Sequence, residues 1–102
     1  MKSFNVRKAR AGFSVLQTLE KSQTATMTLR PGEWSGEKGN EHPKSEQTLL
    51  VVEGVVVAEI GDERRVLHKG DTVIVPCGAA HRFGNESDED AITFNVYAPP
   101  AY

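Results

Sequence analysis

Short runs of alternating or continuous apolar residues, separated by glycine and acidic turns, form the main pattern along this chain. From Gln23 to Leu29 the alternation is regular, with Ala25 and Met27 on one side and threonines on the other. A period of two is typical of a half-buried β-strand. Similar strand signals recur over residues 13–19, 48–53, 55–60, 63–68, 72–75 and 91–98. Helix signals are nearly absent, so the pattern predicts an all-β barrel or sandwich.

The two runs on either side of Gly54, residues 48–53 and 55–60, are almost continuously apolar. Strands of this kind are buried on both faces. One face would line the barrel, and in a monomer the other face would be left in water. We therefore expect a homodimer with this hairpin at the subunit interface.

Composition narrows the class of protein. A chain of 102 residues is long enough for one domain with one core, and we take residues 1–102 as that domain. The net charge of −2, without a basic stripe, gives no reason to expect a nucleic acid or an anionic membrane as partner. No apolar run has the length of a signal peptide or a membrane span, and the single Cys77 excludes an internal disulfide. A cytoplasmic location is the expectation.

The segment from Gly70 to Asn85, GDTVIVPCGAAHRFGN, predicts a strand, a tight turn and a second strand that bears a histidine. Pro76 ends the first strand because it has no amide hydrogen to donate, and Gly78 can adopt the positive φ that such a turn needs. After the turn, His81 shares one face of the strand with Phe83. A histidine held by a rigid turn at the rim of a barrel is well placed to bind a metal ion.

This segment resembles the second signature of the cupin superfamily, whose fixed positions are matched by Gly70, Pro76, Gly78, His81 and Asn85. The first signature is present in altered form within residues 36–54. The ending TFNVYAPPAY resembles that of small cupins described as similar to mannose-6-phosphate isomerase. The resemblance implies a double-stranded β-helix, or jelly roll, in a small single-domain cupin.

The resemblance also implies a set of ligands for a divalent metal ion, namely Asn40, His42, Gln47 and His81. The family usually has three histidines and one glutamate, with the glutamate where Gln47 stands. Without a carboxylate, the ion keeps its whole double charge, so we expect weaker binding, of zinc, iron, nickel, manganese or copper. An alternative register, with His42 in the first position and Lys44 in the second, leaves too few residues before Gln47.

A nearby glutamate is a possible substitute for the missing carboxylate. If His42 and Gln47 point inward, strand parity turns Glu41 and Glu46 outward. A local bulge would reverse either one, since bulges re-aim side chains near active sites.

Parity also predicts the lining of a cavity. The inward positions are Met27, Leu29, Leu49, Val51, Phe83 and one of Phe94 and Tyr97. A mostly apolar lining with a few polar groups at one end is typical of a small-molecule site. Trp34, on the loop before Asn40, either covers the mouth or lies exposed or at an interface.

Two classes of function remain open. One is a metal-dependent enzyme, of dioxygenase or isomerase type, that acts on a small molecule. The other is a non-catalytic module that binds or senses a small metabolite. The intact second signature favours the first class and the missing carboxylate favours the second, and no catalytic residue is named from the sequence.

Overall fold

The structure of the protein is a computed structural model that describes residues 1–8, 11–39 and 42–102. Within these ranges it has one 3-10 helix, η1 (Val6–Lys8), and eight strands: β1 (Gly12–Thr18), β2 (Gln23–Leu29), β3 (Glu46–Glu53), β4 (Val56–Ile60), β5 (Glu63–Leu67), β6 (Thr72–Val75), β7 (His81–Gly84) and β8 (Ala91–Ala98). No helix in this part of the chain has the length and apolar character that crossing a bilayer requires.

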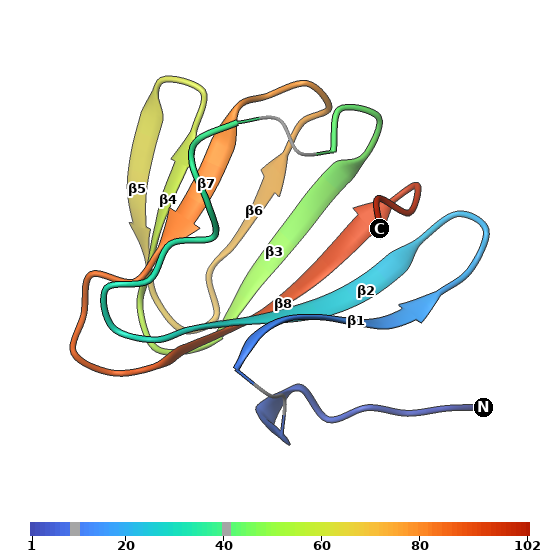
Figure 1. Ribbon diagram of the computed structural model, residues 1–102, viewed down its shortest axis with the longest axis horizontal. Coiled ribbons are helices and arrows are strands. Elements are labelled where there is room, and N and C mark those ends of the chain that lie inside the picture. The colour runs from blue at the N-terminus through green and yellow to red at the C-terminus, as the bar shows by residue number, and fades with distance from the viewer. Residues whose placement is uncertain (9–10, 40–41) are drawn as a thin grey trace.

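The strands form two antiparallel sheets. One sheet has the order β1-β2-β8-β3-β6 and the other has the order β5-β4-β7. Figure 1 shows the sheets splayed apart, with the three-stranded sheet on the left and β1 and β2 on the right. This arrangement is a double-stranded β-helix, so the predicted all-β jelly roll is confirmed.

The strand bounds agree closely with the sequence pattern, with two informative differences. β3 begins at Glu46, two residues before the predicted run, and so includes Gln47. In β1 the register shifts between Val15 and Gln17, and Thr18 pairs with Gln23. A bulge at this point explains why the alternation in β1 is imperfect.

The apolar core lies between the two sheets. Its buried members are Met27, Leu29, Leu49, Val51, Val56, Ala58, Leu67, Val75, Phe83 and Ala91. The hairpin of β3 and β4 was expected to leave an apolar face in water, yet no apolar side chain between residues 48 and 60 is exposed. Of the strands, β1 exposes the most large apolar side chains, at Phe13, Val15 and, just after it, Leu19, whereas β5 exposes Val66 and β6 exposes Ile74. The surface with the most uncovered apolar groups is therefore β1.

The long connection between β2 and β3 runs beside β7 as an irregular edge. Ser35 donates its backbone N–H to the carbonyl of Phe83 at 2.7 Å, and Gly39 and His81 exchange backbone hydrogen bonds of 3.3 and 2.9 Å. This pairing covers the edge of β7 and brings the loop that carries His42 next to His81. The position of His42 thus depends on backbone contacts made well before it in the chain.

Asn85, the last fixed position of the second signature, has a structural role. Its side chain is fully buried, and its amide nitrogen donates to the carbonyls of Leu29 at 2.8 Å and Glu89 at 2.7 Å. Its amide oxygen accepts from the backbone N–H and the hydroxyl of Ser87. These bonds tie the connection between β7 and β8 to the end of β2.

We expect Asn85→Ala to lower the free energy of unfolding by about 2–4 kcal/mol, because buried carbonyls and a hydroxyl lose their partner. Urea denaturation followed by circular dichroism would measure the change. Asp88→Ala, at an exposed residue of the same connection, is the control and should change stability by less than about 0.5 kcal/mol. Equal effects of the two substitutions would contradict this role of Asn85.

Candidate functional site

Two histidines meet between the sheets. His81 begins β7 and His42 lies on the loop before β3, and their side chains are 7% and 4% exposed. The ring centroids are 4.5 Å apart, with an angle of 47° between the ring planes. The predicted meeting of His42 and His81 at one site is therefore what the structure shows.

Each histidine ring is held by a backbone carbonyl. Nδ1 of His81 lies 2.9 Å from the carbonyl oxygen of Ala79, and Nδ1 of His42 lies 3.2 Å from that of Ser45. A carbonyl only accepts hydrogen bonds, so Nδ1 of His81 carries the ring hydrogen and Nε2 is the nitrogen with the lone pair. A histidine that binds a metal ion is usually oriented by this kind of contact at its other nitrogen.

Gln47 links His42 to a row of buried polar side chains on β8. Oε1 of Gln47 lies 2.8 Å from Nε2 of His42, and Nε2 of Gln47 donates to Oδ1 of Asn95 at 2.8 Å. Asn95 donates to the hydroxyl of Thr93 at 3.0 Å, which donates to the carbonyl of Met27 at 2.9 Å. We call Gln47, Asn95 and Thr93 the amide chain.

The amide chain and His42 connect two groups that can only accept hydrogen bonds, the carbonyls of Met27 and Ser45. Five contacts lie between these carbonyls. Thr93, Asn95, Gln47 and a neutral imidazole supply one hydrogen each along this path, which makes four. With a neutral His42 ring, the five contacts therefore share four hydrogens, and one contact has no hydrogen between its two atoms.

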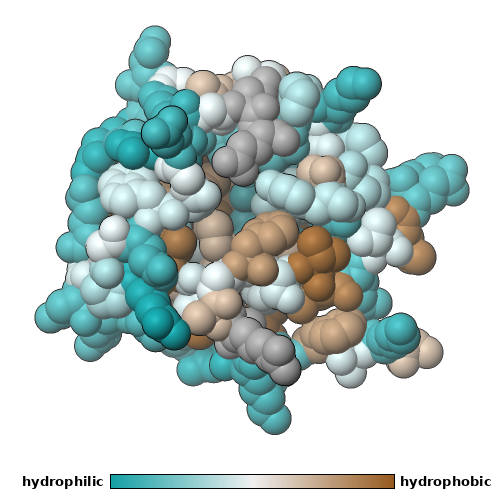
Figure 2. Space-filling model, viewed as in Figure 1, coloured by the Kyte–Doolittle hydropathy of each residue, from teal (hydrophilic) through white to brown (hydrophobic). Residues whose placement is uncertain are grey.

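A cavity of about 230 Å³ opens beside His81. Its lining consists of Phe13, Met27, Ser35, Gln47, His81, Phe83, Tyr97 and Tyr102. The ring centroid of Tyr102 lies 4.7 Å from that of Phe13 and 5.1 Å from that of Tyr97. Figure 2 shows apolar side chains gathered around a hollow on the face of the molecule that holds β1 and β2. The cavity thus has aromatic walls with polar groups at one end.

Gln23 holds the end of the chain at this cavity. Its buried amide oxygen accepts from the backbone N–H groups of Ala101 and Tyr102, and its amide nitrogen donates to the carbonyl of Tyr102 at 2.7 Å. Sequence reasoning missed Tyr102 and Phe13 as lining residues, because no local pattern reports that these two segments meet.

The residues predicted to line the cavity divide into three groups. Met27, Phe83 and Tyr97 line it. Leu29, Leu49 and Val51 belong to the buried core. Of the two alternatives on β8, Tyr97 faces the cavity, whereas Phe94 pairs with Leu50 and Thr26 on the opposite face of the sheet.

The structure places two of the alternative ligands in solvent. Glu46 and Lys44 are both exposed, so Glu46 points outward as parity predicts and Lys44 does not take part in the site. Asn40, expected as the first ligand, and Glu41 lie outside the described residues.

Trp34 lies against the outer face of β7. A side chain at Gly84 would come within 2.2 Å of its indole ring, and the guanidinium carbon of Arg82 is 4.1 Å from the ring centroid. Arg82 in turn donates to Glu59 at 2.8 Å, and this hydrogen bond lowers the pKa of the Glu59 carboxyl. Trp34 lines a smaller hollow of about 150 Å³ beside Phe13 and is not among the lining residues of the histidine cavity.

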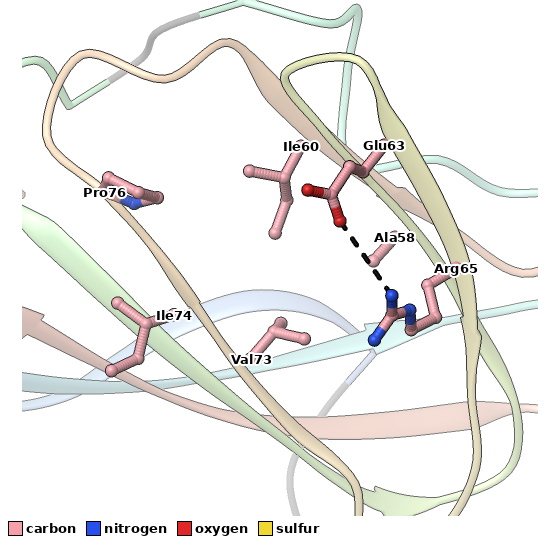
Figure 3. Close-up of a pocket in the computed structure, with 7 residues that line it drawn as sticks. All are labelled: Ala58, Ile60, Glu63, Arg65, Val73, Ile74 and Pro76. Carbon is pink, nitrogen blue, oxygen red and sulfur yellow. Dashed lines mark ion pairs between the residues drawn. The ribbon is translucent and has the colours of Figure 1, made fainter.

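A larger cleft, of about 280 Å³, lies between β4–β5 and β6. Figure 3 shows Ala58, Ile60 and Val73 in this cleft, with the ion pair of Glu63 and Arg65, 3.9 Å apart, along β5. Its lining contains no histidine or amide side chain. We therefore assign the candidate site to the histidine cavity, where polar groups converge.

The donors available for a metal ion are two imidazoles and one amide oxygen, from His42, His81 and Gln47. Within the described residues, no three His, Cys, Asp or Glu side chains lie where they could share one ion. The third donor is thus neutral, as the sequence predicted for position 47. Such a set fits a late first-row divalent ion better than magnesium or calcium, which prefer carboxylates.

Comparison with known proteins agrees with this fold. Residues 25–97 match the family described as the Cupin domain. The protein belongs to the cupin family.

Individual relatives extend the comparison. The chain is 28% identical to a structurally determined protein of Thermus thermophilus, with a TM-score of 0.84 and coverage of 97% of this chain and 98% of that one. It is 29% identical over 89 residues to an uncharacterised protein of Acanthamoeba polyphaga mimivirus, covering 83% of this chain and 54% of that protein. It is 36% identical over 63 residues to the polyketide synthase CurC of Streptomyces cyaneus, covering 62% of this chain and 40% of that protein. The chain therefore spans about half the length of these two curated relatives.

The contact of His81 with Ala79 predicts the tautomer of this ring. At about pH 9, where an ordinary imidazole is neutral, long-range ¹H–¹⁵N spectra should show the hydrogen of His81 on Nδ1. The exposed His68 is the internal control and should show the mixture of tautomers of a solvated ring. A hydrogen on Nε2 of His81 would contradict the orientation described above.

Proposed function

We propose that this cupin binds a small organic ligand at a divalent metal ion held by His42, Gln47 and His81, with Asn40 as a predicted fourth ligand. One observation carries the proposal. Nδ1 of each histidine faces a backbone carbonyl, and Gln47 brings an amide oxygen within 2.8 Å of Nε2 of His42. Two imidazoles and an oxygen thus converge beside the aromatic cavity.

The five contacts between the carbonyls of Met27 and Ser45 share only four hydrogens, and this shortage supports a cation between His42 and Gln47. If the His42 ring donates from Nδ1 to Ser45, the lone pair of Nε2 faces Oε1 of Gln47 at 2.8 Å. Two acceptors at this distance repel each other, but both are attracted to a cation that they share. Adjacent ligands of a six-coordinate first-row ion, each about 2.1 Å from it, lie about 3 Å apart. The separation of Nε2 and Oε1 is close to that value.

The charge of the site suggests the kind of ligand. Neutral donors leave a divalent ion with its full charge, so an anionic or oxygen-rich ligand would be attracted to it. The rings of Phe13, Tyr97 and Tyr102 suit an apolar or aromatic body. We infer a small aromatic or apolar acid, since no lysine or arginine lines the described part of the cavity to bind a phosphate.

Metal-dependent turnover, of dioxygenase or isomerase type, is the second candidate function. A divalent ion would supply Lewis-acid chemistry, or redox chemistry if it is iron or copper. The described lining holds no carboxylate or lysine side chain that could serve as a general base, and its titratable groups are His81, which we assign to the metal, and the hydroxyls of Tyr97 and Tyr102. This observation favours binding over proton-transfer chemistry of the isomerase kind.

We expect untagged protein to contain, or to take up on incubation, about one equivalent of a first-row divalent metal ion. His81→Ala, prepared in the same way, should lose most of it because one of two imidazole donors is removed. Elemental mass spectrometry would measure both proteins. If neither protein holds metal after incubation with each ion, the metal proposal is wrong.

The substitution Gln47→Glu should have the opposite effect to His81→Ala and increase the affinity for the metal ion. It keeps the size of the side chain and adds the negative charge that the family usually has, so the affinity for the ion should rise roughly tenfold or more. Glu46→Gln, which removes the charge of the exposed neighbour, is the control and should leave the affinity unchanged. An unchanged affinity in Gln47→Glu would show that residue 47 does not touch the ion.

A homodimer formed through β1 is a further part of the proposal. β1 is an edge strand without a charged residue, its Phe13 and Val15 are 43% and 40% exposed, and Leu19 just after it is 81% exposed. The opposite edge of the same sheet, β6, is also uncharged but exposes a single large apolar side chain, Ile74, whereas the edge strand β5 carries Glu63, Arg64 and Arg65. Natural proteins use charges of this kind to protect edge strands that stay unpaired.

Sedimentation equilibrium should therefore give twice the chain mass. Val15→Glu should shift the protein towards monomer, because a charge would be placed in the contact. Val66→Glu on β5, where Val66 is 50% exposed, is the matched control and should leave the mass unchanged. A monomeric native protein would contradict the proposal.

A cytoplasmic location remains a prediction. It rests on Cys77, which is exposed and unpaired, because free surface thiols persist in reducing compartments.

A further inference from the structure

Thr93 and Asn95 are polar side chains buried where the core would otherwise be apolar. Both are 0% exposed, and they lie on the inward face of β8 between Ala91 and Tyr97. Neither is among the residues that line the histidine cavity. A buried amide and a buried hydroxyl destabilise a core unless they are hydrogen-bonded, so their partners indicate their role.

The hydrogen bonds of the amide chain run in one direction in the structure, with each side chain donating towards the carbonyl of Met27. That carbonyl only accepts, so the single hydrogen of the Thr93 hydroxyl points to it and the hydroxyl oxygen accepts from Nδ2 of Asn95. Oδ1 of Asn95 must then face Gln47 and accept from its Nε2. Oε1 of Gln47 is consequently the atom that faces His42.

We propose that Thr93 and Asn95 are positioning residues that hold the amide of Gln47 with its oxygen towards His42 and thereby prepare that oxygen to bind the metal ion. The inference rests on the proposed metal site and adds to it the residues that orient one ligand. Orienting groups behind the direct ligands are a general feature of metal sites in proteins.

The chain has a second arrangement that shows why Thr93 matters. If both amides rotate by 180°, Nε2 of Gln47 donates to His42, Asn95 donates to Gln47, and Thr93 donates to Asn95. The reversed chain loses the bond to Met27 but lets a neutral His42 donate from Nδ1 to Ser45, and it presents an NH₂ group, which repels cations, to the metal position. The hydrogen bond from Thr93 to Met27 thus opposes the reversed chain and the one from His42 to Ser45 favours it, so removal of the Thr93 hydroxyl should shift the balance towards the reversed chain.

Thr93→Val is the direct test, because it removes the hydroxyl and keeps the shape of the side chain. The hydroxyl bonds to Met27 and Asn95, and not to His42 or Gln47. The affinity for Zn²⁺, measured by competition with a chromophoric chelator, should fall about five- to tenfold, as the loss of one hydrogen bond implies. Thr93→Ser keeps the hydroxyl and should bind close to the native affinity. Equal losses in the two variants would assign the effect to packing and overturn the proposal.

Thr26→Val is the matched control. Thr26 is also 0% exposed and lies on the neighbouring strand β2, but it faces the other side of the sheet, opposite Phe94. Its hydroxyl has no hydrogen-bond partner within the described residues. The substitution should leave the Zn²⁺ affinity unchanged.

A second measurement needs no metal. In metal-free native protein at about pH 9, Nε2 of His42 should carry the ring hydrogen and donate to Oε1 of Gln47, and in Thr93→Val the hydrogen should move to Nδ1 because Gln47 now donates. Long-range ¹H–¹⁵N spectra report which nitrogen is protonated. No change in the His42 tautomer would overturn the role of Thr93.

The two measurements separate the two proposals. If the native protein binds no Zn²⁺ but the His42 tautomer moves in Thr93→Val, the positioning role is supported and the metal site is wrong. If the native protein binds Zn²⁺ and Thr93→Val binds it equally well, the metal site stands and the positioning role is wrong.

Discussion

The register between β3 and β8 is the constraint on which the site depends. Gln47 pairs with Tyr97 and Leu49 pairs with Asn95, so the side chains of Gln47 and Asn95 are diagonal neighbours on one face of the sheet. A shift of one residue would turn Gln47 outward and bring Thr48 inward. Because β3 lies between β8 and β6 in the sheet, both neighbours resist such a shift. The amide chain, the cavity wall and the oxygen beside His42 all follow from this one alignment.

The same alignment places polar groups in a small core. His42, Gln47, Thr93 and Asn95 are all buried, and the apolar core of Leu49, Val51 and Phe83 lies around them. Their hydrogen bonds compensate for the lost contact with water but add little net stability. They do add direction, since a chain that ends on a backbone carbonyl cannot turn without breaking that bond. We interpret this as stability exchanged for a fixed orientation at the site.

Most of the fold could be predicted from the sequence, because its strands alternate or are continuously apolar and its turns carry glycine. Gly78, for example, adopts the positive φ of 81° expected for the turn before His81. The connection that runs beside β7 could not be predicted, since it pairs through isolated bridges at Trp34 and Gly39 and has no periodic pattern.

The site was harder to predict than the fold, and β8 shows the reason. Its apolar residues Ile92, Phe94 and Val96 are half-buried on the outer face. The inward face carries Thr93, Asn95 and Tyr97. On β8 the polar side chains therefore face the interior and the apolar ones face outward, the opposite of the usual arrangement. For this reason strand parity alone could not choose between Phe94 and Tyr97. The histidines were predicted because a motif, and not hydrophobicity, identified them.

The hydrogen bonds of the amide chain explain why residue 47 is a glutamine and not a glutamate. A glutamate there would have no hydrogen to donate to Oδ1 of Asn95, so Asn95 would have to turn its amide and Thr93 would have to leave the carbonyl of Met27. Glutamine supplies the hydrogen that the present direction of the chain requires. A site that had merely lost its glutamate would leave the new amide hydrogens without buried partners, whereas here Nε2 of Gln47 has one at 2.8 Å. Gln47, Asn95 and Thr93 are thus mutually adapted, as the proposed neutral ligand at position 47 requires.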